Sequence, residues 1–250
     1  AFDYIGEAGI GKSVFLEADD PLLKIGPFAL MSHGSQFPWR LANDADADIN
    51  GGILPQGAYR SVVWGSSETF LYSYDPAVFG KTELISNWGF TSVSKNWNWN
   101  SPEGSPAQVA VFSNGDEVAL YLNGALVGKV KAGESPAADL PKSFLFNLPY
   151  VPGELTAVSY KDGTELSRDT LKTTGTVKQI RLLPEKTEMS ADGHDVIYVR
   201  VELIDEEGLT VPGSDRKLHA SVDGAGILSA FGSANPITDE NYTAGSFTSF

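Results

Sequence analysis

Two tryptophans, spaced two residues apart, have the type and spacing of a sugar-binding platform. Trp97 and Trp99 belong to the segment Asn-Trp-Asn-Trp. In an extended chain, side chains two residues apart point to the same face, so both indoles could stack on a sugar ring. The same rings could instead fill the core between two sheets, where β-sandwich proteins often place a tryptophan. The core position is the more common one for tryptophan in such folds, and stacking on sugar is the alternative.

Alternating aspartates form a second pattern that could bind a ligand. Asp44, Asp46 and Asp48 place carboxylates at every second position, as a calcium-binding loop does. Such a loop also needs a glycine at its sixth position and a glutamate at its twelfth, and counted from Asp44 these positions hold Ile49 and Pro55. We therefore interpret the segment as a solvated acidic loop.

The histidines and serines give no support for metal or nucleophilic catalysis. His33, His194 and His219 lie far apart, and none has a second histidine two or four residues away. No Gly-x-Ser-x-Gly motif is present, so the sequence lacks the usual nucleophile elbow. We expect no metal site and no cofactor.

Composition excludes several classes of protein. The 250 residues carry 18 basic and 32 acidic side chains, for a net charge of −14, so binding to nucleic acid or to an anionic membrane is not expected. There is no cysteine, which excludes disulfides and thiolate metal sites. No apolar run is long enough to span a bilayer, and the first residues do not form a signal peptide, so the localisation stays undetermined.

The segment from Val109 to Lys129 organises the predicted fold. It contains period-2 alternation, a turn at Asn114-Gly115-Asp116, and the dipeptide Asn123-Gly124, which accepts the positive φ of a type I′ hairpin turn. We predict three short strands here, at the centre of one antiparallel sheet.

The rest of the chain is also predicted to be mostly strand. Pro55 to Trp64 is the best helix candidate, with a proline at a starting position and apolar residues spaced for one face. Turn signals recur at the spacing expected of β-sandwich domains. The further predicted strands are residues 69–74, 143–148, 154–161, 165–171, 177–183, 196–204, 218–222 and 227–231.

Several motifs together resemble the C-terminal part of glycoside hydrolase family 2, the family of the large β-galactosidases. FDYIGE is similar to the segment after the last strand of that family's (β/α)8 barrel, and DADINGGILPQGAYRSVVW to the loop and final barrel helix. NWNW, VFSNGDEVALYLNGALVGK and the later blocks are similar to the domains that follow the barrel. The matching blocks are residues 2–7, 46–64, 96–99, 111–129, 151–175, 183–208 and 224–242.

The resemblance implies a mainly β fold with three parts. These are the tail of a (β/α)8 barrel in residues 1–70, an immunoglobulin-like β-sandwich in residues 71–174, and a second such sandwich in residues 175–250. Fewer than the about seven strands of a complete sandwich can be counted in the last part, so we expect it to be incomplete. With the barrel absent, Ile5, Phe28, Leu30, Val62 and Trp64 should pack on the first sandwich or stay exposed.

The resemblance also implies a function. We expect a C-terminal fragment of a retaining β-glycosidase, foremost a β-galactosidase, whose two catalytic glutamates lie on earlier barrel strands, so that this chain contains no catalytic residue and is inactive alone.

The partner implied is a carbohydrate substrate, reached through the parent enzyme. The chain itself would pack against the missing barrel, and homo-oligomerisation is left open. Asp3, Tyr4 and Glu7 follow a barrel strand and would contact substrate in the intact enzyme, although they could equally satisfy local backbone groups. Trp39 is a further candidate at the rim.

Two other functions remain open. One is a carbohydrate-binding module in which exposed Trp97 and Trp99, or Tyr121, stack on sugar. The other is a plain interaction domain, because a fold does not fix a function.

Overall fold

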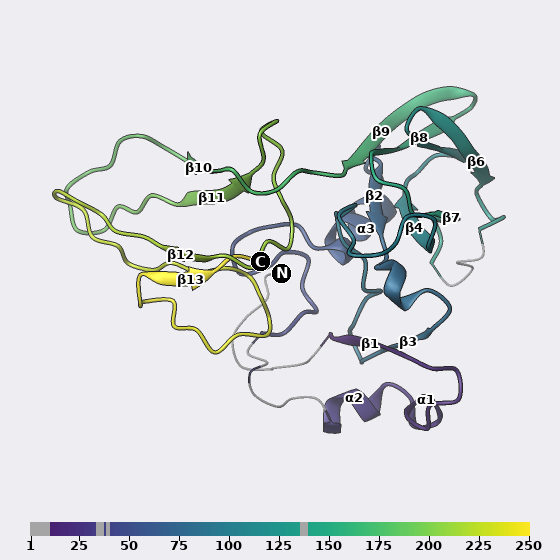
Figure 1. Cartoon of the computed structure of the whole chain (residues 1–250), viewed down its shortest axis with the longest axis horizontal. Helices are drawn as coiled ribbons and strands as arrows, with labels where there is room; N and C mark the ends of the chain where they lie inside the picture. The colour runs from purple at the N-terminus through teal and green to yellow at the C-terminus, as the bar shows by residue number, and fades with distance from the viewer. Residues whose placement is uncertain (1–10, 34–37, 39–40, 136–139) are drawn as a thin grey trace. The chain divides into compact units, whose positions relative to one another are not determined.

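The computed structural model describes residues 11–33, 38, 41–135 and 140–250, which divide into two compact units (Figure 1). The first unit is formed by Ala1–Thr173 and Ser233–Asn241, and the second by Thr174–Gly232 and Tyr242–Phe250. Both consist mainly of small antiparallel sheets, which confirms the mainly β prediction. No helix in the described ranges is long and apolar enough to cross a membrane.

Two antiparallel sheets form the body of the first unit. One has the strand order β2-β4-β7 and the other the order β6-β5-β8-β9. The strands are β2 (Phe70–Ser73), β4 (Pro106–Phe112), β5 (Glu117–Leu122), β6 (Ala125–Lys131), β7 (Ser143–Pro149), β8 (Glu154–Lys161) and β9 (Thr164–Lys172). The rest of this unit contributes a two-stranded sheet of β1 (Ser13–Leu16) and β3 (Thr82–Ile85), and the helices α1 (Leu22–Ile25), α2 (Phe28–His33), α3 (Pro55–Val63) and η1 (Pro76–Val78).

The two larger sheets enclose one hydrophobic core. Val109 and Val111 of β4 meet Val118 and Leu120 of β5 there, and all four side chains are fully buried. Each side chain of this size stabilises the fold by about 1.5–3 kcal/mol when it is removed from water. The alternation of apolar residues in these strands therefore has a direct cause in the packing of the two sheets.

Helix α3 covers the opposite face of the three-stranded sheet. Ala58 and Val62 of the helix pack on Ala110 and Phe112, the residues of β4 that alternate with the core valines. The helix begins at Pro55, as predicted, and its end is held by Asn114, whose Nδ2 donates to the carbonyls at residues 62 and 66 over 2.6 and 2.7 Å. Strand β4 is thus buried on both faces, between a helix and a second sheet.

The hairpin turn predicted at Asn123-Gly124 is confirmed and a second of the same type follows at Asp162-Gly163, but the predicted single sheet is wrong. Asn123 and Gly124 adopt φ values of 51° and 79° between β5 and β6, and Asp162 and Gly163 adopt 51° and 77° between β8 and β9. Positive φ at both central residues is the type I′ geometry. However, β4 pairs with β2 and β7, whereas β5 pairs with β6 and β8, so the turn after Phe112 carries the chain from one sheet to the other.

The second unit contains two small antiparallel pairs. These are β10 (Gln179–Pro184) with β11 (Val199–Ile204), and β12 (Lys217–His219) with β13 (Ser246–Thr248). The strand predicted at residues 227–231 is not formed, and β11 begins three residues later than predicted at 196. At the end of β11, Asp205 accepts backbone N–H groups of residues 175, 207 and 209, and so orders the turn.

Only some of the apolar side chains before residue 70 are buried in this chain. Val62 and Leu30 are buried, whereas Phe28 is 69% and Trp64 is 79% exposed. Ile5 lies outside the described residues. The two outcomes allowed for these apolar side chains, packing and exposure, therefore both occur. The assignment of this segment to a barrel tail, and the boundaries of the three predicted parts, stay predictions.

Candidate functional site

The residues predicted to contact substrate cannot be placed. Asp3, Tyr4, Glu7 and Trp39 all lie outside the described residues. Their role stays a prediction.

Trp97 is part of the core of the first unit and not of its surface. Its side chain is 1% exposed, its Nε1–H donates to the carbonyl of Val151 over 3.0 Å, and its ring contacts that of Tyr150 at 5.0 Å in an edge-on arrangement. A ring with no exposed face cannot stack on a sugar. The expectation of an exposed Trp97 is therefore corrected, because burial of the indole and satisfaction of its one donor favour the core position.

Trp99 is half-buried and packs against the same core. Its Nε1–H donates to Ser73 Oγ over 2.9 Å, and its backbone N–H donates to the Tyr150 hydroxyl over 3.1 Å. Both polar groups are thus used internally. Stacking of Trp99 on a sugar stays a prediction.

The aspartate loop is tied into the structure by its own carboxylates. Asp46 forms an ion pair with Arg60 of α3 at 2.6 Å, and Asp48 Oδ1 accepts the backbone N–H groups of Asn50 and Gly52 over 2.7 and 3.0 Å. These contacts order the loop beneath the helix, so it is less freely solvated than predicted. In the ranges that the structure describes, no three His, Cys, Asp or Glu side chains converge as metal ligands would.

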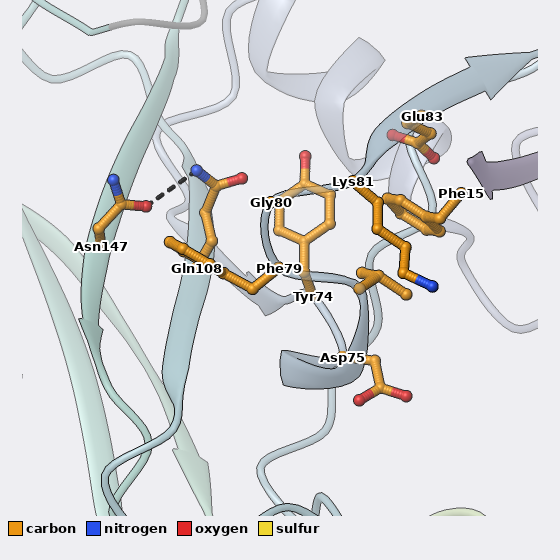
Figure 2. Close-up of a pocket in the computed structure, with 10 residues that line it drawn as sticks. Phe15, Tyr74, Asp75, Phe79, Gly80, Lys81, Glu83, Gln108 and Asn147 are labelled. Atoms are coloured by element: carbon orange, nitrogen blue, oxygen red, sulfur yellow. Dashed lines mark hydrogen bonds between the residues drawn. The ribbon is translucent and has the colours of Figure 1, made fainter. Parts of the chain in front are cut away.

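A pocket of about 340 Å³ lies beside η1 in the first unit (Figure 2). Figure 2 shows Tyr74 at its centre, with Phe79 and Gln108 on one side and Lys81 and Phe15 on the other. The lining residues are Phe15, Tyr74, Asp75, Val78, Phe79, Gly80, Lys81, Glu83, Gln108 and Asn147.

Local structure fixes each wall of this pocket. Asp75 caps η1, because its Oδ1 accepts the N–H of Ala77 over 2.9 Å, and Gly80 follows with a φ of 82° that turns the chain back toward β3. Gln108 of β4 lies directly opposite Asn147 of β7 in the sheet register, and its Nε2 donates to Asn147 Oδ1 over 2.9 Å. The pocket therefore has an ordered turn on one side and a sheet face on the other.

The phenol of Tyr74, at the centre of the pocket, has a raised pKa. Burial raises the pKa of the Tyr74 phenol, and the nearby Glu83 carboxylate raises it further, although a hydrogen bond with Thr91 acts in the opposite direction. The phenol therefore stays protonated at neutral pH. Glu83 has both oxygens occupied, one by Thr91 Oγ1 at 2.7 Å and the other by the N–H of Ser92 at 2.6 Å.

The pocket was missed by the sequence analysis. Its residues come from four separated stretches of sequence, and only the sheet register brings Gln108 to Asn147. The one local signal is Asp75-Pro76, which is typical of a capped helical turn.

Two family models match this chain. Residues 180–250 match the glycoside hydrolase family 2 C-terminal domain 5, and residues 104–167 match a domain of unknown function (DUF4982). The crystal structure of a glycosyl hydrolase family 2 member from Bacteroides cellulosilyticus superposes on 99% of the chain with a TM-score of 0.80 and 33% identity. The chain contains C-terminal domains of glycoside hydrolase family 2.

Curated relatives of these family 2 domains carry two different enzyme names. The β-galactosidase BoGH2A of Bacteroides ovatus is 27% identical over 148 residues, which are 59% of this chain and 17% of that protein. The putative β-glucuronidase of Formosa agariphila is 28% identical over 153 residues, 60% of this chain and 14% of that protein.

The region that matches this chain is a minor part of each relative. The chain matches 17% and 14% of the lengths of those two enzymes and 30% of the solved Bacteroides cellulosilyticus chain. The relatives are therefore larger proteins in which a region of this kind accompanies other domains.

Proposed function

We propose that this chain supplies the accessory, non-catalytic C-terminal domains of a retaining β-glycosidase of the β-galactosidase type. In this proposal residues 1–70 are the tail of its (β/α)8 barrel, and residues 71–174 and 175–250 are immunoglobulin-like sandwiches that brace the barrel, the second of them incomplete. The observation that carries the proposal is the superposition of nearly the whole chain on 30% of a family 2 structure.

Four aspartates of the described residues have structural roles. Asp48, Asp75 and Asp205 each accept backbone N–H groups in turns or caps, and Asp46 is paired with Arg60. A retaining glycosidase instead needs two carboxyl groups about 5–5.5 Å apart, one as nucleophile and one as acid/base. The proposal places that pair on barrel strands encoded upstream of Ala1.

Exposed apolar side chains support docking to a barrel. Trp64 and Val63 at the end of α3 are 79% and 47% exposed, and Ile53 and Phe28 are 65% and 69% exposed. Several large apolar side chains exposed within one segment are typical of a protein–protein interface. Covering them would stabilise the intact protein, because burial of one such side chain contributes about 1.5–3 kcal/mol.

The test compares this chain with the longer polypeptide that its gene encodes. The upstream sequence should contain two glutamates at barrel-strand ends, and the longer polypeptide should hydrolyse an aryl β-galactoside while this chain does not. Trp64→Ser should lower the melting temperature of the longer polypeptide and leave that of this chain unchanged. Leu126→Ser, at a position 54% exposed on β6, is the matched control and should change neither.

Three results would overturn the proposal. They are hydrolysis by this chain alone, an upstream sequence without the two glutamates, and an equal effect of Trp64→Ser in both polypeptides. An aryl β-glucuronide, assayed in parallel, decides between the two enzyme names found among the relatives.

A further inference from the structure

The pocket beside η1 presents an accessible aromatic ring next to unused polar groups. Phe79 is 43% exposed at its rim, and Tyr74 forms its centre (Figure 2). The volume of about 340 Å³ lies at the lower end of the range for small-molecule sites, which is about 300–1,000 Å³. It therefore suits a ligand of one or two small rings and not a large cofactor.

The two amides of the sheet wall have hydrogen-bonding capacity to spare. Their mutual bond uses Nε2 of Gln108 and Oδ1 of Asn147. Among the described residues, neither Gln108 Oε1 nor Asn147 Nδ2 has a hydrogen-bond partner. Figure 2 shows these two atoms at opposite ends of the hydrogen-bonded pair, with Gln108 Oε1 turned toward Tyr74, so that Gln108 offers a free acceptor to a ligand hydroxyl.

The opposite wall adds one cation, Lys81, and two carboxylates, of which Glu83 has both oxygens in use and Asp75 only one. Asp75 uses Oδ1 in capping η1, and Lys81 makes only a 3.4 Å pair with Glu17, whose side chain is 73% exposed. A pair this exposed contributes little and can be exchanged for a ligand at low cost. Because both charge signs line the pocket and the whole chain carries a net charge of −14, an anionic ligand is disfavoured.

We propose that this pocket binds a neutral pyranose sugar, with the ring packed on Phe79 and its hydroxyls bonded to Gln108, Asp75 and Lys81, while Asn147 holds the Gln108 amide in place. A pyranose has an apolar face for the aromatic ring and alternating donors and acceptors around its edge, which are the features that these walls complement. The inference goes beyond the scaffolding role proposed above and does not depend on it.

The experiment is a titration of the isotopically labelled full chain followed by two-dimensional NMR. The probes are methyl β-D-galactopyranoside, methyl β-D-glucopyranoside and, as the anionic comparison, methyl β-D-glucuronide. At least one neutral sugar should give saturable shifts of the side-chain amide signals of Gln108 and Asn147, with a dissociation constant on the order of 1 mM. The glucuronide should bind more weakly.

Two variants locate the binding. Phe79→Ala should weaken it about tenfold through loss of the ring contact. Gln108→Ala should weaken it about fivefold through loss of one hydrogen bond. Trp88→Ala, at an aromatic position 70% exposed outside the pocket, is the matched control and should leave binding unchanged. The melting temperature of each variant reports whether it is folded.

The proposal is overturned by four outcomes. They are the absence of saturable shifts with either neutral sugar, tighter binding of the glucuronide, unchanged binding in folded Phe79→Ala and Gln108→Ala, and loss of binding in Trp88→Ala. Because none of these readouts involves hydrolysis, they are independent of the test of the proposed enzyme role.

Discussion

Replacement of Trp97 by alanine should be among the most destabilising single changes in the first unit. The indole is 1% exposed and contacts Tyr150, and its N–H is bonded to the carbonyl of Val151. Removal of about 200 Å² of apolar surface from this core costs about 5 kcal/mol at 25 cal/mol per Å², which is an upper estimate. Measured truncations of buried Phe and Trp cost about 3–5 kcal/mol, and we expect Trp97→Ala in that range.

Urea unfolding followed by far-ultraviolet circular dichroism measures this loss. The chain has two units, so the transition of the first unit must be resolved before a free energy is assigned. Trp64→Ala is the control, because Trp64 is 79% exposed, and its effect should stay within about 0.5 kcal/mol. Trp97→Phe should give an intermediate loss, because it keeps a ring but leaves the Val151 carbonyl without its donor, at about 1–3 kcal/mol.

One result would refute the placement of Trp97 in the core. If Trp97→Ala costs less than about 1 kcal/mol, as an exposed position would, the buried geometry is not the solution structure. The stacking interpretation of this residue would then return.

Two further predictions concern turns. Gly153→Ala should destabilise the first unit by about 1–3 kcal/mol in urea unfolding, because φ is +134° and the new Cβ would lie 1.9 Å from Asn123 Oδ1; Gly128→Ala, which meets nothing within 4 Å, is the control, and equal effects would contradict the reasoning. Hydrogen bonds from the backbone, first of all from Gly175, hold the pKa of Asp205 below its ordinary value of 3.8, so the unfolded state takes up its proton first as pH falls. The contribution of Asp205 to the stability of the second unit should therefore be complete above about pH 5 and decline as the pH falls toward the lower folded-state pKa. This decline should be smaller in Asp205→Asn, and identical acid profiles of the two proteins would exclude the mechanism.

Local signals predicted much of the fold correctly. Asn123-Gly124 and Asp162-Gly163 specify their turns because only a few residue types accept positive φ, and Pro55 marks the start of a helix whatever packs on it. The predicted strands 143–148 and 154–161 nearly coincide with β7 and β8, because their alternation of apolar residues reflects one face buried in the core.

The incorrect predictions concern features that depend on contacts between residues far apart in the sequence. Asn114 looks like a turn residue, but its side chain holds the end of α3, and the chain crosses between sheets there, which no neighbouring residue specifies. The short helices α1 and α2 were not predicted, and neither was the pairing of β1 with β3 across the sequence between them. Trp97 shows why a binding site is hard to predict from sequence. A tryptophan suits both a core position and a sugar-stacking position, and only the packing of the two sheets determines which one it occupies.

The double burial of β4 has a consequence for protein engineering. A strand exposed on one face can be redesigned one layer at a time, but Val109 and Val111 serve one layer while Ala110 and Phe112 serve another. Enlarging Ala110, which is 1% exposed, would push α3 outward, and enlarging either valine would wedge the sheets apart. In a library of variants, Pro106–Phe112 would be the segment that tolerates the least diversity, and grafted loops or altered surfaces are better sought on β6 and β9.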